Sequence, residues 1–171
     1  METTGNSRRI AVIMARRKLA NRWASEQWEA KGAVPDETAP VENSAPPSPP
    51  PGQLIGQLIV THADGAEYLF PGLVVKLDRV EAEGYYLNLT SAAPKLFVLW
   101  RMRGELATPE HVTVSYNEGT RWADGGEQVD GVSLPLELAP WMADFVERHY
   151  RPEPKKARRY ASNKDHALPD A

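Results

Sequence analysis

The chain of 171 residues contains no cysteine. Disulfide bonds, thiolate catalysis, iron–sulfur ligation and cysteine zinc sites are therefore excluded. Small secreted domains commonly depend on disulfides, so their absence favours a reducing compartment. The chain also lacks any apolar run near the ~20 residues of a transmembrane helix, and the run at residues 10–15 is too short for a signal-peptide core. We expect a cytoplasmic protein without a membrane span.

Recognisable catalytic motifs are lacking as well. The sequence has no phosphate-binding loop, dinucleotide fingerprint or GxSxG element. Three carboxylates flank a Gly-Gly pair without EF-hand spacing, the histidines have no metal-ligand spacing, and the serines have no evident base partner. We therefore expect no catalytic residue, no metal and no cofactor. The residues considered are Asp124, Glu127 and Asp130; His62, His111, His149 and His166; and Ser25, Ser91, Ser115 and Ser133.

Proline, by contrast, is abundant, with 15 residues against 12 glycines. Many prolines fall within residues 35–51, a stretch that is acidic and has no aromatic residue. It cannot bury enough apolar surface to offset ordering, so we expect a disordered loop. The segment before it is shorter than the ~40 residues of an independent core. The sequence thus predicts one β-rich domain at residues 9–150, between disordered residues 1–8 and a disordered tail at 151–171.

Charge is distributed unevenly along the chain. The net charge is +4 over residues 1–32, −7 over residues 55–146 and +5 over residues 151–164. The basic ends are either solvated or a contact for an acidic partner. The acidic body would repel phosphates, which argues against nucleic acid. The basic tail is formed by Lys155, Lys156, Arg158 and Arg159.

The body carries a pattern typical of strands. Apolar and β-branched residues alternate with polar ones in short runs separated by turn residues. Asp64-Gly65 predicts a hairpin, and Pro71-Gly72 predicts a bend or bulge. Residues 117–124 could form a helical turn. The expected strands are residues 53–61, 67–70, 73–80, 85–90, 95–102, 111–116 and 128–134.

One helix is predicted near the C-terminus. Residues 135–150 show an apolar stripe at spacings of three and four, and the regular part is expected at 140–150 because Pro140 lacks an amide hydrogen. Residues 15–31 allow two interpretations. Their composition favours a helix ending at Gly32, whereas their weak apolar stripe favours a strand at 9–15, a bend, and a strand at 22–34. The helix stripe comprises Leu138, Trp141, Met142, Phe145, Val146 and His149.

Four blocks resemble a bacterial family described only as a domain of unknown function: RRKLANRWASEQWEAKGAVPD, YYLNLTSAAPKLFVLWRM, VTVSYNEGTRWADGGEQVDGV and FVERHYRPEPKKARR. The resemblance implies that the first block is strand–bend–strand, although this chain has Lys18 where the family often has proline. We therefore expect a mainly β (α+β) fold of seven to nine strands. The strands would form a curled antiparallel sheet, a partly open barrel or sandwich resembling the pleckstrin-homology arrangement, with one C-terminal helix.

The resemblance also implies a setting for function. Genes of this family tend to lie beside those for molybdenum-containing formate dehydrogenases and their chaperones. This implies a non-enzymatic, protein-binding accessory factor, with formate dehydrogenase or its assembly factors as the partner. A nucleic-acid-binding module using the basic termini, or an uncharacterised hydrolase or transferase, stays as the alternative. Oligomeric state is left open by the sequence.

Tryptophan supplies the candidate contact site. Trp23 and Trp28 are separated by an odd number of residues, so on a regular strand they would face opposite sides. One of them would then be exposed beside three arginines, and aromatic residues with arginine are enriched at interface hot spots. The sequence predicts a partner-binding patch of Arg16, Arg17, Arg22, Trp23 and Trp28.

Overall fold

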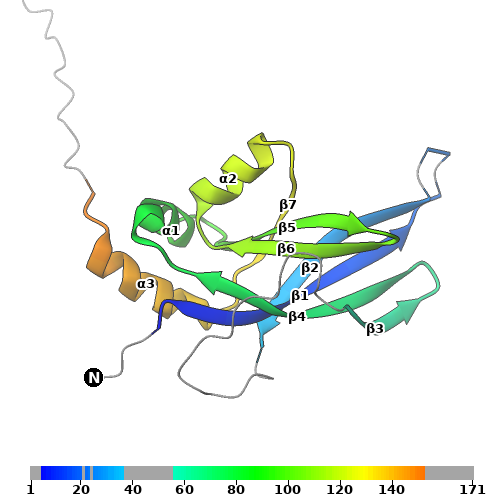
Figure 1. Ribbon diagram of the computed structural model, residues 1–171, viewed down its shortest axis with the longest axis horizontal. Helices are drawn as coiled ribbons and strands as arrows, with labels where there is room; N and C mark the ends of the chain where they lie inside the picture. Colours follow the sequence, from blue (N-terminus) through cyan, green and yellow to red (C-terminus); the bar gives the residue numbers. More distant parts are fainter. Residues whose placement is uncertain (1–4, 21, 24, 37–55, 153–171) are drawn as a thin grey trace, which may run out of the picture.

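The computed structural model describes residues 5–20, 22–23, 25–36 and 56–152 (Figure 1). Within them the chain forms two antiparallel sheets, which do not close into a barrel, and three α-helices. The elements are β1 (Ser7–Lys18), β2 (Glu26–Pro35), β3 (Gln57–His62), β4 (Gly65–Lys76), a 3₁₀ turn (Arg79–Glu81), α1 (Ala82–Leu89), β5 (Lys95–Arg103), β6 (Leu106–Thr113), α2 (Tyr116–Asp124), β7 (Gln128–Ser133) and α3 (Leu138–His149).

Sheet A has four strands in the order β2-β1-β4-β3. The strand interpretation of the N-terminal segment is therefore confirmed, because β1 and β2 form an antiparallel hairpin. The Pro71-Gly72 bulge is confirmed too. Ile10 pairs with Leu73 and Val12 with Phe70, so two residues of β4 oppose one of β1, and Gly72 has a φ of 90°, which glycine adopts without steric cost.

Sheet B has three strands in the order β6-β5-β7. It packs over sheet A so that β7 lies against β2 and β6 against β4. The core between them is one apolar cluster that also includes α3 residues. Asp130 of β7 joins the sheets, since its Oδ2 accepts hydrogen bonds from the amide of Ala30 at 2.9 Å and from Trp100 Nε1 at 2.8 Å.

The helices gather at the end of the molecule away from the hairpin tips (Figure 1). α2 packs on sheet B and begins at Ser115, whose Oγ accepts from the amide of Glu118. α1 packs against α3 through an edge-to-face contact of Tyr85 and Phe145. α3 is the longest of the three described helices, with 12 residues. None of the described helices is long and apolar enough to cross a membrane.

Two sequence predictions are wrong in this region. Residues 85–90 form most of α1 and not a strand, because Ala82, Tyr85 and Asn88 bury one helical face. The strand expected at 111–116 is displaced, since β6 ends at Thr113 and α2 starts at Tyr116. Besides the predicted C-terminal helix, α1 and α2 therefore also belong to the fold, and α2 corresponds to the helical turn considered at 117–124.

The remaining strand predictions are confirmed with small shifts. β5 and β7 lie at the expected places, and β4 runs through the bulge as one strand that ends at Lys76, four residues before the expected end, because residues 79–81 form the 3₁₀ turn. β1 begins two residues before the expected position. Most of the expected proline-rich loop at 35–51, residues 153–171 of the expected tail, and the first four residues lie outside the described residues.

Candidate functional site

The predicted contact patch lies at the tip of the β1–β2 hairpin. Arg16 and Arg17 are near the end of β1, whereas Arg22 and Trp23 lie in the turn. Trp23 is 90% exposed. We call Arg17, Lys18, Arg22 and Trp23 the hairpin tip; all four are exposed. The hairpin projects from the end of the molecule opposite the helices (Figure 1).

Trp28 does not belong to this exposed surface. It is half-buried on β2, its ring centroid lies 5.8 Å from that of Tyr68, and it packs against the core. The two tryptophans differ in exposure, but the odd spacing is not the reason, because Trp23 lies in the turn and not on a strand. Trp28 faces Arg16 across the hairpin and packs against Tyr68, so Trp23 is the tryptophan that the hairpin tip exposes.

The basic side chains near the tip are only partly neutralised within the described residues. Arg16 forms an ion pair with Glu26 at 3.6 Å, and its buried Nε has no hydrogen-bond partner. Arg17 donates to the neutral amide oxygen of Gln27 at 3.0 Å. A cation whose partner is a neutral amide keeps its charge available to an incoming anion. The tip therefore presents positive charge around an exposed indole.

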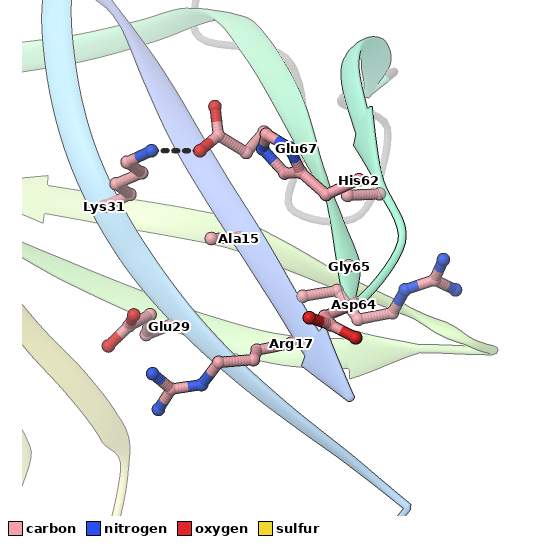
Figure 2. A pocket seen from close by; sticks show the side chains of 10 residues that line it. Ala15, Arg17, Glu29, Lys31, His62, Asp64, Gly65 and Glu67 are labelled. Atoms are coloured by element: carbon pink, nitrogen blue, oxygen red, sulfur yellow. Dashed lines mark hydrogen bonds and ion pairs between the residues drawn. The ribbon is translucent and has the colours of Figure 1, made fainter. Parts of the chain in front are cut away.

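A depression of about 480 Å³ adjoins the tip on sheet A. Its floor includes the small residues Ala15, Gly65 and Ala66. Figure 2 shows Lys31 and Glu67, on either side of β1, joined in an ion pair. Glu29, His62 and Asp64 also line the depression.

Because the depression is open and is lined mainly by side chains of both charges, it suits contact with a polar protein surface better than enclosure of an apolar small molecule. Sequence reasoning missed this depression. The signal in the sequence is that Ala15, Gly65 and Ala66 are small residues beside charged ones. That they meet on adjacent strands can be recognised only when the strand register is known.

The other candidate groups do not converge on one site. Glu127 pairs with Arg101, and the hydrogen bond from that guanidinium lowers the pKa of the Glu127 carboxyl. Asp130 is engaged in joining the two sheets. Ser115 Oγ donates to Glu81 at 2.6 Å while it caps α2. Each of these polar groups thus has a structural partner.

The histidines are likewise dispersed. His62 lies on β3, His111 on β6 near Trp122, and His149 on α3 against Phe145. Across the described part of the chain, no group of three or more histidine and acidic side chains could hold a metal ion. His166 and the basic tail residues lie outside that part.

Comparison with known proteins identifies only the family. None of the curated proteins or solved structures compared with the chain matches it. One family model, described as a protein of unknown function (DUF3305), matches residues 9–159. These residues include every described strand and helix except the first two residues of β1. The chain therefore belongs to the DUF3305 family.

Proposed function

We propose that the protein is a non-enzymatic accessory factor that binds a protein partner through its hairpin tip. The observation that carries the proposal is the 90% exposure of Trp23 at the end of a projecting hairpin, beside Arg17 and Arg22. Exposing a large indole to water is unfavourable, and tryptophan and arginine dominate the energy of protein interfaces.

The proposed partner is a molybdenum-containing formate dehydrogenase or one of its assembly factors. This choice depends on the gene neighbourhood implied by the family resemblance. The engagement of Ser115 and Asp130 in structural hydrogen bonds supports a role without catalysis, as does the dispersal of His62, His111 and His149 over different elements.

The first test is binding of the full chain to the enzyme and to its assembly factors. Trp23→Ala is expected to weaken binding about tenfold or more, the effect of removing an interface hot spot. Leu136→Ala is the matched control, because Leu136 is also highly exposed, at 86%, but precedes α3. Binding is measured by calorimetry, and the melting temperature of each variant is compared. Equal binding by the wild type and Trp23→Ala would overturn the assignment of the tip.

The second test addresses the biological role. A strain lacking the gene is expected to contain formate dehydrogenase with reduced activity and reduced metal-cofactor content. Complementation with the wild-type gene should restore both quantities, whereas complementation with Trp23→Ala should not. Normal enzyme in the deletion strain would end the accessory-factor proposal, whatever the tip binds.

A further inference from the structure

Strand β3 is an open edge of sheet A. Within the described residues it pairs only with β4. Alternate residues of an edge strand direct their amide and carbonyl groups away from the sheet, where another strand can bind them. The sequence of β3, QLIVTH, has no Lys, Arg, Asp, Glu or Pro. Leu58 is 57% exposed and Ile59 45% exposed.

The other sheet edges in the described part of the chain carry features that prevent strand addition. Charged residues, proline and bulges are the usual protection. On β2, the amide of Ala30 is also occupied by Asp130. Strand β3 has no charged residue and no proline; its one protecting feature is a bulge between Leu58 and Val60, and the residues on both sides of it stay paired with β4. The protecting residues are Glu26, Glu29, Lys31 and Pro35 on β2, Pro109 and Glu110 on β6, and Asp130 on β7.

The packing of the two sheets explains why β3 is exposed on both faces. Sheet B contacts sheet A through β7 with β2 and through β6 with β4 and β1. Strand β3 lies beyond β4 in sheet A and is not among the strands through which sheet B makes its main contacts. Leu58 pairs with Tyr68, a residue that packs on the core, yet Leu58 is more than half exposed. An apolar side chain on the core-facing side of the sheet is therefore left without a covering layer by the part of the chain that the structure describes.

We propose that β3 is a self-association edge, at which two copies of the chain pair antiparallel to join their A sheets. The unpaired backbone groups accept only an extended strand. A two-fold antiparallel pairing brings β3 beside the reversed β3 of the other copy, so that residue i of each strand faces residue j of the other, and like charges on β3 would be brought close together. The absence of charge from β3 removes that repulsion, and the chain's net charge of −3 adds little. The pairing would also cover Leu58 and Ile59 of both copies.

The size of this contact predicts a weak dimer. Six residues extend about 20 Å, and one pair of such strands buries less than the roughly 1,200 Å² of stable complexes. We therefore expect monomer and dimer to exchange in the range between about 10 μM and about 1 mM. The surface is separate from the hairpin tip, since β3 and β1 lie on opposite sides of β4.

Sedimentation equilibrium of the full chain over that concentration range tests the proposal. The apparent mass should rise towards that of a dimer, and amide hydrogen exchange in residues 57–62 should slow as concentration rises. Ile59→Lys and Ile59→Glu should each weaken the dimer about tenfold or more, since residue 59 lies near the centre of β3, where the like charges of the two copies would lie close together. A mixture of the two variants should dimerise again, because opposite charges then face each other.

Met102→Lys is the matched control, since Met102 is 47% exposed on the central strand β5. This variant adds the same charge to an exposed apolar residue and should dimerise as the wild type does. A constant monomer mass, a dimer unaffected by Ile59→Lys, or failure of the mixed variants to associate would each overturn the proposal. If a protein partner slowed amide exchange in β3 while the chain alone stayed monomeric, that partner and not a second copy would bind this edge, and the proposal would be wrong. Trp23→Ala should dimerise as the wild type does, so failure of the dimer proposal and failure of the hairpin-tip proposal can be distinguished.

Discussion

Two buried polar side chains on α1 fix how this helix meets its surroundings. The side-chain Nδ2 of Asn88 donates to the backbone carbonyls of Lys95 and Val114 at 2.7 and 2.8 Å, and its Oδ1 accepts from the backbone amide of Lys95. The hydroxyl of Tyr85 accepts from the Asp78 amide at 2.8 Å. Burial raises the pKa of Tyr85 to about 12, opposed by the Asp78 hydrogen bond and assisted by nearby carboxylates.

The shift at Tyr85 predicts a loss of stability at alkaline pH. The folded state holds the phenolic proton more tightly than the unfolded state, so the contribution of Tyr85 is complete below pH 10 and declines as pH rises towards 12. Urea denaturation across this window should show a shallower decline for Tyr85→Phe than for the wild type. Tyr86→Phe, which alters the exposed neighbour, should decline as the wild type does. A Tyr85→Phe curve parallel to that of the wild type would refute this account.

At the scale of elements, the first residue of β4, Gly65, lies directly against the backbone of β1. A Cβ built on Gly65 would lie 2.0 Å from the backbone carbonyl oxygen of Arg16. Gly65→Ala must therefore push β1 and β4 apart, and we expect unfolding free energy to fall by about 2 kcal/mol. Gly32→Ala is the control, because no atom lies within 4 Å of its added Cβ; its effect should stay within about 0.5 kcal/mol. Chemical denaturation measures both, and equal effects would contradict the crowding argument.

Among the elements, the hairpin of β1 and β2 could be predicted from the sequence, and the helix α1 could not. The strand–bend–strand form of β1 and β2 was predictable with the help of the family pattern, against local propensity. The helix α1 was not, because Tyr85, Leu87 and Leu89 alternate as in a strand. Packing decides it: a Cβ on Gly84 would lie 2.1 Å from Ser115 Oγ, so this glycine admits close contact with the start of α2.

The candidate site was partly predictable for a similar reason. The association of Arg17, Arg22 and Trp23 follows from their nearness in sequence, and their place at a hairpin end follows from the bend. The half-buried state of Trp28 depends on Tyr68, which is distant in sequence. The exposure of β3 depends on how far sheet B extends over sheet A. Features set by contacts between distant residues have no local signal.

At the scale of the whole molecule, the two sheets and α3 share a single apolar cluster. We therefore expect one cooperative unfolding transition. Trp100 and Trp141 are both buried, one on sheet B and one on α3, so fluorescence reports on the core. Its denaturation curve should coincide with that of far-ultraviolet circular dichroism. Separate midpoints for the two signals would indicate that the sheets unfold independently.

The place of β1 inside sheet A has a consequence for synthesis on the ribosome. Strand β1 pairs with both β2 and β4, yet β4 emerges only after β2, the proline-rich stretch and β3 have been translated. Until then, one side of β1 and its apolar residues Ile10, Val12 and Met14 lack their native partners. A nascent chain with such an exposed strand is prone to aggregation. Lower temperature weakens association between exposed apolar surfaces, so expression in the cold should raise the soluble yield of this protein.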